Sequence, residues 1–103
     1  MKIQIITEDS KTLKISIYGR LDLMGRQEFE KAFPPLLKED IQNVVIDLSN
    51  VDFVASIGMR SLVSLAKDLS AKNGELVLTN LQENVYDTFI TTGLDKILKI
   101  EDN

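Results

Sequence analysis

Apolar residues alternate with polar ones in two runs near the start of the chain. The apolar positions of these runs are Ile3 and Ile5, then Leu13, Ile15 and Ile17. A period of two predicts half-buried strands, and the polar segment 8–11 between the runs predicts the turn of a hairpin. We expect two antiparallel strands, the second of which ends at Gly19.

Beyond position 25 the spacing of apolar residues changes to that of a helix. They recur at i, i+3, i+4, i+7 and i+8: Phe29, Ala32, Phe33, Leu36 and Leu37. This predicts one apolar helix face, with Gly25 as a tolerated N-cap and Glu28 three residues later. Because proline inside a helix loses a hydrogen bond and clashes with the preceding turn, we expect a kink or break at Pro34-Pro35. A short second piece would reach about Glu39.

In the rest of the chain, strand patterns alternate with helix patterns. Residues 44–48 form an apolar run with one acid, typical of a strand that is buried on both faces and therefore central and parallel. Three further elements are expected before a last strand over 97–100 and the acidic tail 101–103. They are a helix over 57–72 that ends at Asn73-Gly74, a strand over 76–79, and a helix around Val85, Phe89 and Ile90 closed by Gly93.

The element order β-β-α-β-α-β-α-β predicts an α/β fold in which helices cover a mixed sheet that begins with a hairpin. A length of 103 residues and an apolar fraction of 44% suit a single domain over residues 1–103. The sequence shows no internal repeat and no linker.

Composition argues against several classes of function. The chain has no cysteine and no histidine, so it lacks thiolate metal ligands and the commonest general base. Its net charge of −4 argues against nucleic acid as a partner, and no apolar run approaches the roughly 18 residues of a membrane span. The N-terminus does not resemble a signal peptide. We expect a cytoplasmic protein that is not an enzyme, needs no metal or cofactor, and binds neither nucleic acid nor membranes.

Three aspartates, Asp22, Asp47 and Asp52, could gather at one edge of the sheet. Carboxylates at strand ends more often cap turns or face solvent, so a metal or acid–base role is the minority interpretation. A receiver-like phosphoacceptor at Asp47 would need paired acids after the first strand, which the chain lacks. It would also need an all-parallel sheet, which the opening hairpin contradicts.

The segment 47–60 carries the most functional information. A buried strand leads into a loop, and the loop into a helix whose expected N-cap is Ser56. As a cap, the Ser56 hydroxyl would accept a hydrogen bond from the backbone N–H of Gly58 or Met59. The same helix N-terminus would stabilise a phosphate on Ser56, because free N–H groups and the positive end of the helix dipole lie there. The local pattern thus leaves two interpretations of Ser56 open: a plain helix cap, which it favours, and a site of regulation by phosphorylation.

A helical wheel at about 100° per residue divides this helix into two sides. The core side holds Leu62, Leu65, Ala66 and Leu69, with Gly58 close by, and the outer side holds Ile57, Arg60, Ser61, Ser64 and Asp68. We expect Ile57 to be an outward apolar contact for a partner, and Arg60, one turn after Ser56, to pair with a phosphate there. Gly58 provides either slack in the first turn or room for close packing against a neighbouring backbone or a partner.

At this point the chain resembles the anti-sigma factor antagonists of the STAS domain class. The element order matches, and three motifs carry the resemblance over nearly the whole chain. They are Gly19-Arg20-Leu21-Asp22, like the family's Gly-x-Leu-Asp loop; residues 47–53, like the strand and loop before its phosphorylation site; and Thr92-Gly93-Leu94, like its C-terminal signature.

The resemblance implies a protein that, when unphosphorylated, binds an anti-sigma factor that is also a serine-protein kinase, and so frees a sigma factor. Phosphorylation of Ser56 by this kinase would release the antagonist, and a PP2C-type serine phosphatase would reverse the modification. Asp22 matches the loop aspartate that lies near the acceptor and supports phosphorylation or binding. The expected partner-binding residues are Asp22, Ala55, Ile57, Gly58, Met59 and Arg60.

Two residues beside the acceptor depart from the family pattern. Ala55 stands where the family usually has aspartate, and Ile57 where it usually has serine or threonine. Ala55 reduces like-charge repulsion of a phosphate on Ser56. The departures leave an alternative open: a constitutive STAS scaffold, or an accessory subunit of a larger assembly such as a transporter, that is not phosphorylated.

Overall fold

Five strands form one sheet whose spatial order follows the chain, β1-β2-β3-β4-β5. The computed structural model describes residues 1–101. Strand β1 (Lys2–Glu8) is antiparallel to β2 (Thr12–Leu21), and β3 (Asn43–Val54), β4 (Glu75–Thr79) and β5 (Lys99–Ile100) each run parallel to the strand before them. The predicted α/β class, the opening hairpin, the mixed sheet and the central parallel β3 are confirmed.

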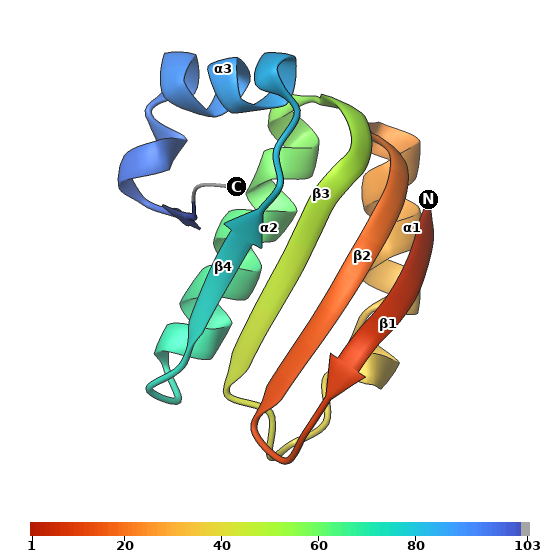
Figure 1. Ribbon diagram of the computed structural model, residues 1–103, viewed down its shortest axis with the longest axis vertical. Helices are drawn as coiled ribbons and strands as arrows, with labels where there is room; N and C mark the ends of the chain where they lie inside the picture. The colour runs from red at the N-terminus through yellow and green to blue at the C-terminus, as the bar shows by residue number, and fades with distance from the viewer. Residues whose placement is uncertain (102–103) are drawn as a thin grey trace.

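Two helices pack side by side against one face of the sheet, and a third lies across its end (Figure 1). Helices α1 (Leu23–Ala32) and α2 (Ser56–Ser70) cover the face, and α3 (Glu83–Thr92) lies beyond the end of β3. The core fills the space between the sheet and the helices. Its fully buried side chains include Leu13, Ile15, Ile17, Val44, Ile46, Leu48, Leu62 and Leu69. None of the helices within residues 1–101 is long and apolar enough to cross a membrane.

The break predicted at Pro34-Pro35 is present, but the start of the helix before it differs from expectation. The helix α1 ends at Ala32, and a short 3-10 turn, η1 (Pro34–Leu36), follows. The N-cap is Asp22, not Gly25: the Asp22 carboxylate accepts a hydrogen bond of 2.9 Å from the Gly25 N–H. Gly25 lies inside the first turn, where a Cβ atom would be 2.0 Å from the carbonyl oxygen of Arg20. Close packing, not capping, explains this glycine.

Both central strands extend further than the sequence predicts. Strand β2 does not end at Gly19, which has a φ of +113° and lies within the strand between two shifts of register. Strand β3 does not give way to a loop after position 48 but continues to Val54, where it is still paired with Leu21. Each strand supplies hydrogen-bond partners for the other, so both stay extended up to the edge where α1 and α2 begin.

The C-terminal third follows the predicted order with small corrections. At the end of α2 the left-handed residue is Asn73 (φ 64°), not Gly74. Gly74 instead allows close packing, because a Cβ atom there would lie 1.6 Å from the carbonyl oxygen of Gln42. Gly93 closes α3 in the left-handed conformation, as predicted. The last strand is shorter than expected because a 3-10 turn, η2 (Leu94–Lys96), precedes it. Positions 102 and 103 of the acidic tail lie outside the described residues.

Candidate functional site

Ser56 is the first residue of α2 and is exposed at the end of the sheet. The prediction that it is the N-cap is wrong, because Ala55 holds the cap position with an extended backbone (φ −93°, ψ 162°). The Ala55 N–H donates a hydrogen bond of 3.0 Å to the carbonyl oxygen of Leu21, and the helix begins directly after it, one residue earlier than expected. Among the described residues, no side chain caps this helix.

The N-terminus of α2 therefore retains free backbone N–H groups. The first bond along the helix runs from the Met59 N–H to the Ala55 carbonyl oxygen, at 3.0 Å. The first turn lies wholly within residues 1–101 and carries no acidic side chain. Free N–H groups and the positive end of the helix dipole favour an anion at this point. The aspartate usual at position 55 would compete for these groups, and Ala55 does not.

The other residues expected to bind a partner divide into buried and accessible ones. Gly58 is buried, and Met59 is only 3% exposed. Ile57 is half-buried rather than fully outward, while Ala55 is half-buried and Arg60 is exposed. Gly58 and Met59 therefore pack inside the fold beneath the site, whereas Ala55, Ile57 and Arg60 reach its surface.

The helical wheel placed Ser61 on the outer side of α2, which is wrong. Ser61 is 6% exposed, and its hydroxyl donates a hydrogen bond of 2.9 Å to the Glu30 carboxylate on α1. Helix α1 packs against this flank of α2, which a wheel of one helix alone does not show. Of the predicted core residues of α2, Leu62, Leu65 and Leu69 are buried, and Ala66 is half-buried against the core.

A groove of about 460 Å³ begins at Ser56 and follows α2 toward its C-terminus. We call it the acceptor groove. Its other lining residues come from α2, from the end of α3 and from η2: Met59, Arg60, Val63, Ser64, Lys67, Thr92 and Leu94. Ser56 and Arg60 thus share one surface depression, and the charged side chains that line it, Arg60 and Lys67, are both basic.

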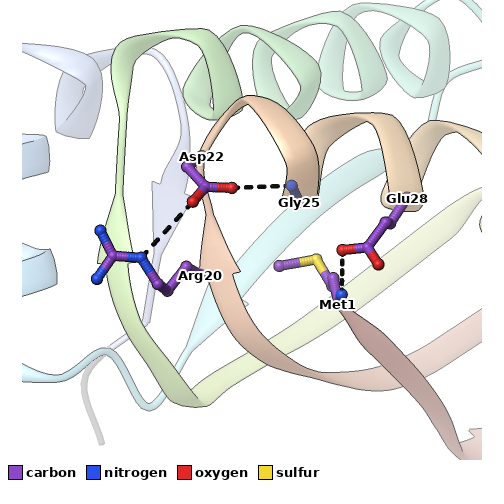
Figure 2. A network of polar contacts seen from close by, with 5 residues as sticks. All are labelled: Met1, Arg20, Asp22, Gly25 and Glu28. Carbon is purple, nitrogen blue, oxygen red and sulfur yellow. Dashed lines mark hydrogen bonds and ion pairs between the residues drawn. The ribbon is translucent and has the colours of Figure 1, made fainter.

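Asp22 lies at the same end of the sheet, in the segment that follows β2 (Figure 2). Its carboxylate caps α1 through Gly25, and its second oxygen is 3.6 Å from Nε of Arg20. The hydrogen bond from the Gly25 N–H, with a smaller contribution from Arg20, lowers the pKa of Asp22 below its ordinary value. The guanidinium of Arg20 lies 4.3 Å from the centre of the Phe53 ring, which links the ends of β2 and β3.

Exposed apolar side chains at this end of the sheet were not assigned from the sequence. Leu23 is 54% exposed and Met24 is 70% exposed in the first turn of α1, and Phe53 is 39% exposed near the end of β3. Leu23 and Met24 fall outside the apolar face predicted for their helix, which is the signal that could have identified them. We call these three residues the apolar rim.

The aspartates considered as a metal or acid–base cluster do not form one. Among residues 1–101, no three acidic side chains lie close enough together to hold a metal ion. Burial acts to raise the pKa of Asp47, but hydrogen bonds from Ser49 and Asn80 outweigh it and leave that pKa lowered. The Asp47 carboxylate accepts from the Ser49 N–H at 2.8 Å, and the Asp52 carbonyl accepts from the Asn84 side chain at 2.7 Å. Both residues lie within β3, where Asp47 bonds to the strand backbone and the Asp52 carbonyl joins the strand to α3.

The family sequence model of the STAS domain matches residues 3–103 of the chain. The chain belongs to the STAS domain family. An anti-sigma-B factor antagonist of Staphylococcus aureus is 24% identical to it over 102 residues, which cover 99% of this chain and 94% of that protein. The unphosphorylated form of the anti-sigma factor antagonist SpoIIAA has the same fold, with a TM-score of 0.81 and 19% identity over 99% of this chain and 88% of that one.

Similar STAS folds occur in different contexts. An anti-sigma factor antagonist from Mycobacterium paratuberculosis matches with a TM-score of 0.77 and 25% identity, over 96% of this chain and 85% of that one. A murine Solute Carrier 26 anion transporter matches with a TM-score of 0.62 and 18% identity, over 87% of this chain but only 15% of the transporter. The fold of this STAS domain is therefore shared by free-standing regulators and by a small part of a membrane protein.

Proposed function

We propose that this STAS domain is an anti-sigma factor antagonist, a binding protein rather than an enzyme, that acts in the cytoplasm. In its unphosphorylated form it binds an anti-sigma factor that is also a serine kinase, and a sigma factor is freed. Phosphorylation of Ser56 ends that complex, and a PP2C-type phosphatase restores it. The observation that carries the proposal is the exposed Ser56 at the uncapped N-terminus of α2.

The surroundings of Ser56 support phosphorylation without unfolding. A phosphate there adds roughly −1.5 to −2 charges, which the free N–H groups and the dipole of α2 stabilise. Arg60 lines the same groove and is one turn away, within reach of a phosphate on this residue. A change of charge, rather than a change of fold, would then break the complex.

The contact surface in this proposal combines the acceptor end of α2 with the apolar rim. Ala55, Ile57 and Arg60 contact the kinase directly, whereas Gly58 and Met59 hold α2 in place beneath them. Asp22 keeps the first turn of α1 in position, so that Leu23 and Met24 stay on the surface. Aromatic and Met side chains are enriched at the centres of protein interfaces, which fits the rim.

The departures at positions 55 and 57 favour one alternative, a constitutive scaffold or accessory subunit of a larger assembly such as a transporter. In that case the apolar rim would bind a fixed partner, and Ser56 would not be modified. The two functions differ in whether ATP dissociates the complex.

The test uses the purified chain and the anti-sigma factor kinase from the same genome. We expect a stable complex that ATP and Mg²⁺ dissociate while one phosphate is added at Ser56, identified by mass spectrometry. Ser56→Ala should bind but accept no phosphate, and Ser56→Asp should bind poorly. Ser70→Asp, an exposed serine at the other end of α2, is the matched control and should bind normally. A complex that persists with ATP, without label on Ser56, would favour the scaffold.

A further inference from the structure

The outward side of α2 carries opposite charges on its two flanks. Arg60 and Lys67 line the acceptor groove on the flank that faces α3 and η2. On the other flank, Glu30 and Asp68 line a second groove of about 380 Å³ between α2 and the α1–η1 segment. Ser64 lines both grooves, so it marks the ridge that separates them. We call the two sides the basic flank and the acidic flank.

The charges nearest this ridge form no ion pair with the described residues of the domain. Across residues 1–101, the structure gives Lys67, Asp68 and Arg60 no ion pair, and all three side chains are exposed. Glu30 differs, because it already pairs with Arg26 at 2.9 Å and accepts the Ser61 hydroxyl. Lys67 and Asp68 are therefore the charges most available to another molecule.

The ridge is low from Ser64 to the end of α2, because small residues form it there. Ser64 and Ala71 are seven residues apart and exposed, so they lie one above the other along α2. Lys67 and Asp68 are consecutive and point about 100° apart, one on each side of this line. Helices with small side chains at their contact approach closely, at about 8 Å between axes. The surface thus offers a shallow seam with one basic and one acidic side.

We propose that a second copy of this chain docks on the seam, with the two α2 helices side by side and parallel. A two-fold axis parallel to the helices puts the basic flank of one copy and the acidic flank of the other on the same side of the contact, so these two flanks meet. Lys67 then faces Asp68 of the partner subunit, Arg60 faces Glu30 of the partner subunit, and each pair occurs twice. An antiparallel pair would instead bring basic flank to basic flank, so the charges select the parallel arrangement.

The match favours a second copy over an unrelated partner, because each flank has its charge complement on the opposite flank of the same domain: Asp68 of α2 for Lys67, and Glu30 of α1 for Arg60. The pairs are exposed, so the dimer is weak and weakens further as salt screens them. Because the dimer covers Arg60 and the acceptor groove, it competes with any partner that binds there. The inference goes beyond the proposed function, and its tests use the chain alone.

The first test places a single thiol on the proposed axis. The chain has no cysteine, so Ser64→Cys introduces one defined thiol. A disulfide needs Cα atoms roughly 4.4–6.8 Å apart, which two parallel helices in contact provide at this position. We expect Ser64→Cys to form a covalent dimer under mild oxidation at least about tenfold faster than the control Ser10→Cys in the exposed β1–β2 turn. Equal rates for the two variants would overturn the proposal.

The second test exchanges the charges. Lys67→Asp and Asp68→Lys each create repulsion in a homodimer and should weaken it about tenfold at low salt, measured by analytical ultracentrifugation. An equimolar mixture of the two variants restores both opposite-charge pairs and should recover dimerisation, as should the double variant. Circular dichroism checks that every variant is folded. A wild-type chain that stays monomeric at about 1 mM, or a mixture no better than either variant alone, would contradict the parallel dimer.

Discussion

The carbonyl oxygen of Leu21 occupies space that a side chain on Gly58 would need: a Cβ atom there would be 2.2 Å from it. The same carbonyl accepts a hydrogen bond from the Ala55 N–H at 3.0 Å. The end of β2 is thereby fixed against the first turn of α2, and this contact orients Ser56. Of the two explanations that the sequence leaves open for Gly58, close packing against a neighbouring backbone is confirmed.

Gly58→Ala should destabilise the domain although alanine is the better helix former. The added methyl group overlaps the Leu21 carbonyl and lies 2.6 Å from its Cγ atom, so backbone must move. We expect a net loss of about 2 kcal/mol in the free energy of unfolding, after a gain of about 1 kcal/mol in helix propensity. Urea unfolding measures the difference. Ser70→Ala on the same helix is the control and should be neutral or slightly stabilising. A Gly58→Ala domain as stable as wild type would show that this contact is loose.

Asp22→Asn should lower stability in a pH-dependent way. Asparagine keeps an acceptor for the Gly25 N–H but loses the charge, and hydrogen bonding to Gly25 lowers the pKa of Asp22 in the folded state. A lowered folded pKa stabilises the protein above the unfolded value of about 3.9, and this stabilisation is lost as the pH falls through the folded pKa. The gap between wild type and variant in urea unfolding should therefore be present at neutral pH and close in acid. A gap of constant size from pH 7 down to pH 2 would argue against a charge effect.

Arg60→Ala should raise the second pKa of a phosphate on Ser56. The guanidinium favours the doubly charged form of the phosphate, so its removal makes protonation easier. We expect the pKa, followed by phosphorus NMR on the phosphorylated domain, to rise by about half a pH unit from a value near 6. Lys72→Ala, beyond the C-terminal end of α2, serves as the control. An unchanged pKa in Arg60→Ala would remove this contact from the proposed switch.

Met24→Ser should weaken binding to the anti-sigma factor kinase with little effect on the fold. Met24 is 70% exposed, so its replacement should change the free energy of unfolding by less than about 0.5 kcal/mol. As part of the apolar rim it should raise the dissociation constant about tenfold, which calorimetry would measure. The control is Ile6→Ser, an exposed apolar residue on the edge strand β1. If both variants bind as wild type does, the rim is not part of the interface.

Several sequence predictions about the site were wrong, because the outcome at those residues depends on contacts between segments that are distant in the chain. Ser56 matches the residue type of a helix cap, but the hydrogen bond between Leu21 and Ala55 moves the cap to Ala55. Ser61 has the polarity of a surface residue, but α1 covers it and Glu30 accepts its hydroxyl. Phosphorylation of the exposed Ser56 stays a prediction.

The sequence by itself determined the element order, the strand and helix types, and the breaks at Pro34-Pro35 and Gly93. These features depend on local periodicity and on the backbone limits of proline and glycine, which act within a few residues. Tertiary structure alone decided where β2 and β3 end, which residues cap α1 and α2, and which flank of α2 is open. Those outcomes depend on hydrogen-bond partners and on neighbouring backbone, such as the Leu21 carbonyl beside Gly58, that folding brings from elsewhere in the chain.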